Sequence, residues 1–159
     1  MNFLSQFRAI CGNYSLTAIK RSPVNSNWTC SVYRGGKRIG TASHIDEIKP
    51  SIFDSKPTQY NIEPVEEKTL LEWIDKAGPY GFESIEEFLE TVMAWVVLLK
   101  KMDRLVKEQR LVAVDTHYLD PHNMPKEFES TRRKVDARWI KDYKKSYSER
   151  MAVVNGMWH

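Results

Sequence analysis

Residues 92–99, with the sequence VMAWVVLL, form the longest uninterrupted apolar stretch of the chain. They lie in the middle of residues 84–110, where apolar side chains recur every three or four positions, as on one face of a helix. Ser84 followed by Glu87 has the pattern of a capping box, in which each side chain accepts a hydrogen bond from the other residue's backbone. We therefore predict a helix over residues 84–110. Because its two middle turns are apolar on every side, we expect this helix to be buried between other layers of the fold.

Residues 14–43 predict a small antiparallel sheet. Residues 28–34 and 37–42 flank Gly35 and Gly36, and this is a strong hairpin signal because glycine readily adopts the positive φ of a tight turn. Residues 14–20 alternate weakly between apolar and polar and belong to the same sheet. Counted back from the turn, the expected cross-strand pairs are Val32 with Ile39, Cys30 with Thr41, and Tyr33 with Arg38. The apolar face of the hairpin, which should pack on a helix, is expected to carry Trp28, Cys30, Val32 and Ile39.

The remaining segments are mainly helical. Residues 44–62 contain two prolines and show no regular period, so we expect a long irregular crossing. Pro64 suits the first turn of a helix running to about residue 77, and Pro125 suits the start of a final helix running to about residue 154. Residues 111–114 (LVAV) fit either a short strand or the last turns of the long helix.

The expected fold class is therefore α+β. A small N-terminal antiparallel sheet, with its β-hairpin over residues 28–42, packs on a predominantly helical C-terminal part whose central buried helix is 84–110. At 159 residues the chain is expected to form a single domain, residues 1–159, with a sheet region at 1–44 and a helical region at 64–155.

The overall composition, with 42% hydrophobic and 28% charged residues, is that of a soluble globular protein. The eight-residue apolar run is far shorter than the about 20 residues that span a membrane. The first residues also lack the apolar core of a signal peptide. We therefore expect a cytoplasmic protein with no membrane partner, in which Cys11 and Cys30 are reduced, partly buried thiols. The oligomeric state is left open.

Charge is segregated along the chain, although the net charge is only +3. Residues 1–44 carry six basic residues and no acidic residue, residues 45–90 carry twelve acidic and four basic residues, and residues 91–159 carry fourteen basic and nine acidic residues. Segregated charge steers charged partners; the alternative is that the segments neutralise one another in the folded protein. The basic candidates for partner binding are Arg34, Lys37 and Arg38 at the hairpin tip and Arg133, Lys134, Arg138, Lys141, Lys144 and Lys145 on the final helix.

The expected final helix is the most informative surface. Plotted at 100° per residue, one side of the helix, which is backed by aromatic residues, carries a basic stripe with Glu127 as the only acid among its members, which are Lys126, Arg133, Lys134, Arg138, Lys141, Lys144 and Lys145. A basic stripe of this kind can follow the phosphates of nucleic acid. It can also bind an acidic protein surface or the acidic segment of the chain itself, and a solvated amphipathic helix has the same pattern. No zinc finger or other base-reading motif accompanies it.

Acidic residues gather where the two expected helices at 64 and 84 begin. Arranged on one face, they would imitate the spacing of phosphates and occupy a nucleic-acid-binding groove of another protein. The alternative is that they complement the positive N-terminal ends of the helix dipoles. The acidic candidates around the start of the long helix are Glu83, Glu86, Glu87 and Glu90.

Residues 115–123 (DTHYLDPHN) contain ligand types that bind divalent transition metals. Their spacing matches no established metal motif, and an ordinary polar loop has the same composition. The chain also lacks the His-Glu-x-x-His, Walker, Gly-x-Ser-x-Gly and Cys-x-x-Cys patterns. We expect no cofactor and no enzymatic activity, with a metal-dependent hydrolase as the minor alternative. The candidate ligands for that alternative are Asp115, His117, Asp120 and His122.

Residues 28–43 (WTCSVYRGGKRIGTAS) resemble a segment that recurs in small accessory proteins of phages and mobile elements. Those segments consist of an aromatic strand, a Gly-Lys turn, and a hydrophobic-Gly-Thr-small ending. The resemblance covers about a tenth of the chain, and residues 44–47 (HIDE) depart from the glycine-rich stretch that tends to follow. Several such proteins, anti-CRISPR proteins among them, inhibit host defence by binding and blocking a nuclease or surveillance complex.

Together with the segregated charge and the lack of a catalytic motif, the resemblance implies a non-enzymatic phage or mobile-element protein that acts in the host cell cytoplasm. Its partner would be a host protein or ribonucleoprotein complex of a bacterial defence system, blocked by steric or electrostatic occlusion. The alternative function is direct nucleic-acid binding through the hairpin tip and the basic final helix. The sequence does not identify the target, nor whether the basic or the acidic surface binds it.

Overall fold

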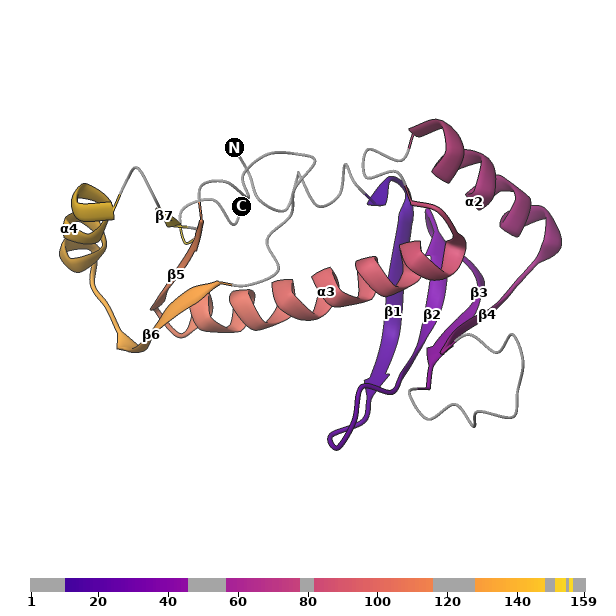
Figure 1. The fold of residues 1–159 in the computed structure, drawn as a ribbon. Coiled ribbons are helices and arrows are strands. Elements are labelled where there is room, and N and C mark those ends of the chain that lie inside the picture. The colour runs from indigo at the N-terminus through magenta and orange to yellow at the C-terminus, as the bar shows by residue number, and fades with distance from the viewer. Residues whose placement is uncertain are drawn as a thin grey trace. The chain divides into compact units, whose positions relative to one another are not determined.

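The computed structural model describes residues 11–45, 57–77, 82–115, 128–147, 151–153 and 155. These residues form an α+β fold, as the sequence predicts, with two antiparallel sheets and three helices (Figure 1). The chain divides into two compact units, one comprising residues 11–93 and the other including residues 94–159. The expectation that residues 1–159 form a single domain stays a prediction.

The first unit contains a four-stranded antiparallel sheet in the order β1-β2-β3-β4. Its strands are β1 (Tyr14–Arg21), β2 (Trp28–Arg34), β3 (Lys37–His44) and β4 (Thr58–Ile62). The predicted hairpin is thus confirmed, and Gly35 has the positive φ, 60°, that its turn requires. The predicted irregular crossing over residues 44–62 is wrong at its end, because residues 58–62 pair with β3 and direct Thr58 and Ile62 into the core. Residues 46–56 lie outside the described part of the chain.

The register of the hairpin is shifted by a β-bulge. The predicted pair of Tyr33 with Arg38 is confirmed, but beyond it Val32 pairs with Gly40, because Ile39 is an extra residue on β3. Cys30 therefore faces Ala42 instead of Thr41. A side chain at position 40 is not tolerated, since a Cβ there would lie only 2.1 Å from the carbonyl oxygen of Asn61 on β4. The bulge lets β4 approach closely while Ile39 still points into the core.

One face of this sheet is packed and the other is open. The predicted apolar face is confirmed, because Trp28, Cys30, Val32 and Ile39 are all buried. The first part of helix α3 (Ile85–Lys107) crosses this sheet, and helix α2 (Pro64–Ala77) lies near one end of it, where Trp73 contacts Tyr14 of β1 (Figure 1). The aromatic rings that join the sheet to both helices meet at Phe88, whose ring centroid lies 5.9 Å from Tyr14, 5.5 Å from Trp73 and 5.2 Å from Phe82.

Helix α3 begins where the sequence predicts. The Ser84 Oγ atom accepts a hydrogen bond from the Glu87 backbone N–H at 3.1 Å, as in a capping box. The Glu87 carboxylate accepts one at 2.9 Å from the backbone N–H of Glu83, one residue before the predicted donor. The prediction that the middle of this helix is buried on every side is wrong, because Ala94 is exposed while Trp95 is buried.

The second unit contains a three-stranded antiparallel sheet in the order β6-β5-β7, together with a short helix. Its elements are β5 (Arg110–Asp115), β6 (Glu129–Lys134), α4 (Ala137–Tyr147) and β7 (Met151–Val153). Residues 111–114 thus form a strand, which resolves the alternative left open by the sequence, and all four are buried. On one side of β5, Leu111 and Ala113 pack with Val153 and with the partly buried Ile140 and Tyr143 of α4.

The predicted final helix over residues 125–154 is therefore wrong. Its first part is strand β6, its middle is the eleven-residue α4, and its end is strand β7. The physical reason is that the buried strand β5 needs hydrogen-bond partners along both of its edges, and the flanking segments supply them. Asn155 also contacts β5: its side chain accepts a hydrogen bond from Val112 N at 2.9 Å and donates one to Arg110 O at 2.8 Å.

Candidate functional site

The basic hairpin tip is largely neutralised within its own unit. The Arg34 guanidinium donates two hydrogen bonds to the Glu66 carboxylate at the start of α2, at 2.6 and 2.9 Å. Lys37 lies 3.4 Å from a carboxylate oxygen of Glu63 and 3.8 Å from one of Glu66. Of the three predicted tip cations, only Arg38 makes no ion pair with another described residue. The alternative reading, that charged segments neutralise one another, holds at this tip.

The partner of Arg34 is the only buried carboxylate among the residues that the structure describes. Glu66 is only 4% exposed, whereas the side chain of Arg34 is 41% exposed. Hydrogen bonds from Arg34 hold the pKa of Glu66 below its usual value; burial opposes this shift, and attraction to Arg34 and Lys37 adds to it. The pair ties the end of β2 to the start of α2, so these two residues have a structural role that the sequence does not reveal.

Three of the four acidic candidates make contacts within the protein. Glu87 caps α3, and Glu90 accepts a 2.5 Å hydrogen bond from the hydroxyl group of Thr58, a residue only 1% exposed. The Thr58 hydroxyl in turn lies 2.8 Å from Nδ1 of His44. Glu86 also has an interaction partner, and Glu83 is exposed. These contacts favour helix capping and packing over the imitation of phosphates.

The metal candidates are not brought together within the described part of the chain. Asp115 is exposed at the end of β5, and His117, Asp120 and His122 lie outside the described residues. No group of three or more potential metal ligands occurs among the described His, Cys, Asp and Glu residues. Cys11 and Cys30 are free and buried, and burial raises their pKa values to about 12 and about 11. Neither thiol is an activated nucleophile.

The basic C-terminal candidates are divided between two neighbouring elements of the second unit. Arg133 and Lys134 lie on strand β6, and Arg138, Lys141, Lys144 and Lys145 lie on helix α4. At 100° per residue the four cations of α4 span about 120° of the helix circumference, opposite the side on which Ile140 and Tyr143 meet the core. The predicted one-sided basic stripe is therefore present over this shorter helix.

A bulge in β6 exposes two adjacent arginines. Between the pairs Arg110–Lys134 and Val112–Ser130, three residues of β6 face a single residue of β5. The hydroxyl group of Thr131 fills the interrupted ladder: it accepts from Leu111 N at 3.0 Å and donates to Arg133 O at 2.8 Å. Arg132 and Arg133 are both exposed. Bulges commonly redirect side chains in this way beside functional sites.

The start of α4 adds an exposed aromatic ring to these cations. The Asp136 carboxylate caps the helix by accepting a hydrogen bond from the Trp139 backbone N–H at 2.8 Å. Trp139 is 44% exposed and stacks on Tyr143, with ring centroids 5.6 Å apart and an interplanar angle of 15°. The ring centroids of Tyr143 and Tyr147 in turn lie 4.7 Å apart. The aromatic rings thus form a continuous row along α4.

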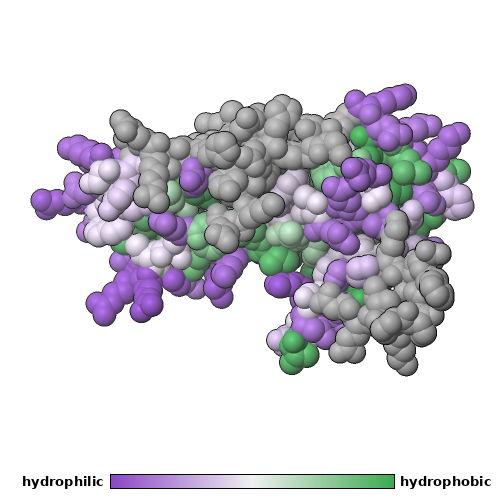
Figure 2. Space-filling model, in the orientation of Figure 1, coloured by the Kyte–Doolittle hydropathy of each residue, from purple (hydrophilic) through white to green (hydrophobic). Residues whose placement is uncertain are grey.

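We call β6, residues 135–136 and α4 together the β6–α4 surface. An open hollow of about 650 Å³ lies on it, lined by Thr131, Arg132, Arg133, Lys134, Val135, Asp136, Arg138, Trp139 and Asp142. Residues 129–147 contain seven basic and three acidic residues, and hydrophilic residues gather over these elements (Figure 2). None of the seven cations forms an ion pair with another residue that the structure describes.

Sequence reasoning missed part of this surface. Arg132 was not a candidate because a continuous helix would place it on another face than Arg133, whereas at the bulge in β6 both residues are exposed. Asp136 carries the signal that was overlooked: an aspartate before a run with helical spacing marks a helix start. With the helix beginning there, residues 129–134 are free to pair with β5.

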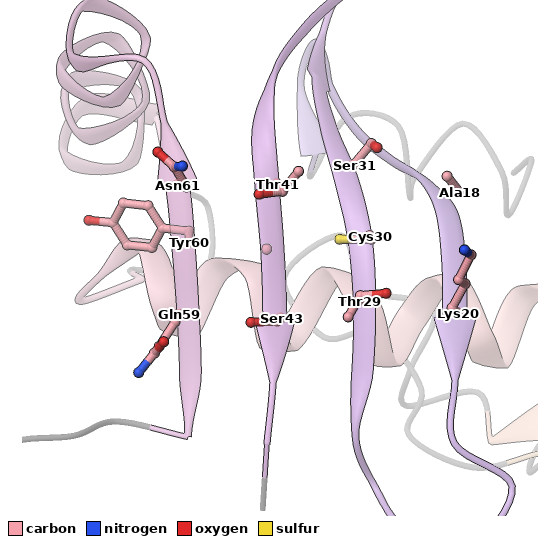
Figure 3. Close-up of a pocket in the computed structure, with 11 residues that line it drawn as sticks. Ala18, Lys20, Thr29, Cys30, Ser31, Thr41, Ser43, Gln59, Tyr60 and Asn61 are labelled. Carbon is pink, nitrogen blue, oxygen red and sulfur yellow. The ribbon is translucent and has the colours of Figure 1, made fainter. Parts of the chain in front are cut away.

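The open face of the four-stranded sheet forms a second hollow. It is shallow, about 430 Å³ in volume, and Figure 3 shows the side chains that line it. Lys20 lies at one side and Tyr60 at the other, and no acidic residue contributes. The hydroxyl and amide side chains of this outer face are Thr29, Ser31, Thr41, Ser43, Gln59 and Asn61.

Comparison of the chain with models of protein families, with curated proteins and with solved structures gave no match. Among the described helices none contains a segment long and apolar enough to span a lipid bilayer.

Proposed function

We propose that the protein is a non-enzymatic binding protein whose β6–α4 surface holds nucleic acid. The observation that carries the proposal is a surface with seven cations that have no described ion-pair partner, four of which line an open hollow together with an exposed aromatic ring. Lysine and arginine side chains bind nucleic acid by neutralising its phosphates, which releases the counterions held there. The hairpin tip, whose Arg34 and Lys37 already pair with carboxylates, is a poorer candidate for this role.

Binding is tested by fluorescence anisotropy with labelled oligonucleotides of about 20 nucleotides, single-stranded and duplex, between about 50 and 200 mM salt. We expect the affinity of the natural protein to fall steeply as salt rises. The double variant Arg132→Glu/Arg133→Glu should bind at least about tenfold more weakly and reduce the salt slope by about one to two.

The matched control is Lys68→Glu/Lys76→Glu, which makes the same change in net charge at exposed positions of α2. This control should bind within about twofold of the natural protein at about 50 mM salt. Absence of binding at the lowest salt concentration would overturn the proposal. Equal losses in the two double variants would show that only net charge matters, and would also overturn it.

The second candidate is inhibition of a bacterial defence complex by occlusion, as the hairpin resemblance implies. The observation in its favour is the open outer face of the sheet, where an array of hydroxyl and amide side chains offers hydrogen bonds to a protein surface. The proposal is that a protein component of such a complex binds this face, which is broad and free of acidic residues.

This candidate is tested by affinity capture from a bacterial lysate that contains an active defence system. We expect one nuclease or surveillance subunit to be recovered in stoichiometric amount, and to be lost with Ser31→Arg/Thr41→Arg but retained with Ser26→Arg, an exposed control outside the sheet. Recovery of no such subunit, or equal recovery with both variants, counts against the candidate.

A further inference from the structure

We infer that the β6–α4 surface binds single-stranded nucleic acid, with one unpaired base stacked on Trp139 and the adjoining phosphates held by Arg132, Arg133 and Arg138. This inference deepens the proposed function and rests on it.

The ring of Trp139 is already held in the position that stacking requires. One face is supported by Tyr143 at 5.6 Å and a nearly parallel angle of 15°, and the Asp136 cap fixes the backbone N–H of the same residue. With 44% of Trp139 exposed, the ring remains accessible. A pre-positioned ring loses little conformational freedom on binding, so stacking adds directly to affinity.

The hollow beside Trp139 has the size and the mixed charge that a nucleotide needs. Its volume of about 650 Å³ lies within the range of small-ligand sites, about 300–1,000 Å³. Arg132, Arg133 and Arg138 line it together with the exposed carboxylate of Asp142. A site for phosphate alone gains nothing from a carboxylate, whereas the amino groups of adenine, cytosine and guanine can donate hydrogen bonds to one. The arginines therefore suit the backbone, and Asp142 with Trp139 suits the base.

These contacts favour a single strand over a duplex. Within a duplex the faces of the bases are covered by their neighbours, so an aromatic ring can stack only on a base that is unpaired or at an end. Duplex binding would instead use the outward cations of α4 on the phosphates and leave Trp139 without a role. The two modes therefore differ in their dependence on this one side chain.

The experiment compares three labelled probes of equal length: a single strand, the corresponding duplex, and a single strand with abasic sites in place of its bases. We expect the natural protein to bind the single strand most tightly. Trp139→Ala should weaken binding to the base-containing strand about tenfold or more, and leave the duplex and abasic probes within about twofold. Trp139→Phe should retain most of the affinity, because phenylalanine keeps an aromatic face.

The controls separate this inference from the proposed function and from misfolding. A misfolded Trp139→Ala variant would lose affinity for the abasic strand as well, and its melting curve would change. If the abasic strand binds as tightly as the base-containing strand and the Arg132→Glu/Arg133→Glu variant weakens both, the inference fails while the proposed function stands. Equally tight binding of polyglutamate would show a general preference for acidic polymers and overturn both.

Discussion

The hairpin tip and the β6–α4 surface are both basic in sequence, yet their cations have different surroundings in the fold. At the tip, Arg34 and Lys37 meet Glu66 and Glu63 at the start of α2, so that their charges hold one part of the first unit to another. On the β6–α4 surface, the cations have no described carboxylate partner, and Asp136 is engaged in capping α4. A cluster of basic residues is a candidate binding surface only where the fold does not pair those residues with carboxylates.

The two clusters differ in ion pairing because they lie next to different parts of the fold. The strand that ends at Arg34 runs beside the N-terminus of α2, where acidic residues are favoured by the helix dipole. One carboxylate, Glu66, therefore serves the dipole and the arginine together. The β6 bulge and the outward side of α4 face away from the core packing of β5, so their cations are left to solvent or to a partner.

The largest expected effect comes from removing the ion pair between Arg34 and Glu66 at the hairpin tip. Arg34→Gln removes the hydrogen bonds that lower the pKa of Glu66 and leaves a buried carboxylate with a poorer partner. A carboxyl group with a lowered folded-state pKa stabilises the fold above its unfolded pKa of about 4.3, and this stabilisation is lost as pH falls through the folded pKa. We therefore expect a clearly lower Tm at pH 7 and a difference from the natural protein that shrinks as pH falls below about 4.3 and through the lowered folded-state pKa of Glu66.

Arg38→Gln is the control for this prediction, since it removes a neighbouring exposed cation that has no ion pair among the described residues. Both variants should keep their oligonucleotide affinity within about twofold at about 200 mM salt, where exposed charges at a distance are screened. Equal Tm values for the two variants at pH 7, or a difference that does not depend on pH, would contradict the role assigned to the Arg34–Glu66 pair.

An intermediate effect is expected from removing the hydroxyl group that bridges the β6 bulge. Thr131→Val keeps the shape of the side chain but removes the acceptor for Leu111 N and the donor to Arg133 O. Loss of these two bonds should destabilise the second unit by about 1–2 kcal/mol and weaken oligonucleotide binding by displacing the arginines. Chemical denaturation and anisotropy measure the two effects. Thr131→Ser keeps the hydroxyl group and should behave like the natural protein; a loss as large as that of the valine variant would point to packing instead.

The smallest effect is expected from the charge of the α4 cap. Asp136→Ser removes a negative charge beside the hollow but retains an oxygen that can cap the helix. Affinity for the single strand should rise about two- to fivefold, which is the range of one exposed charge interaction. In Asp136→Ala the cap is lost too, so helix content should fall while the charge change is the same. A serine variant that binds more weakly than the natural protein would show that the carboxylate itself contacts the ligand.

The elements with local signals could be predicted from the sequence. Gly35 and Gly36 determine the hairpin turn, Pro64 marks the start of α2, and Ser84 with Glu87 marks the start of α3. The hairpin register could be predicted only up to the bulge, because the extra residue at Ile39 depends on the close approach of β4 at Gly40.

Features that depend on distant parts of the chain could not be predicted. Strand β6, with the sequence ESTRRK, has no apolar alternation, and it forms because the buried β5 needs a partner. The pairing of Arg34 with Glu66 joins residues 32 positions apart, so nothing in either neighbourhood reveals it. The sequence therefore indicated which basic residues after position 132 belong to the candidate site. It did not indicate how the fold arranges them.

The bulge at residues 131–133 also bears on how this surface can change over evolutionary time. The Thr131 hydroxyl group and the Arg110 side chain, which donates to Thr131 O at 2.6 Å, bridge the interrupted ladder there. Arg132 and Arg133 are exposed, and their side chains make no ion pair with a described residue. Substitutions at these two positions can alter charge and specificity with little cost to folding. Under the proposed function, single mutations at these positions can therefore change ligand preference on a framework that need not adapt to them.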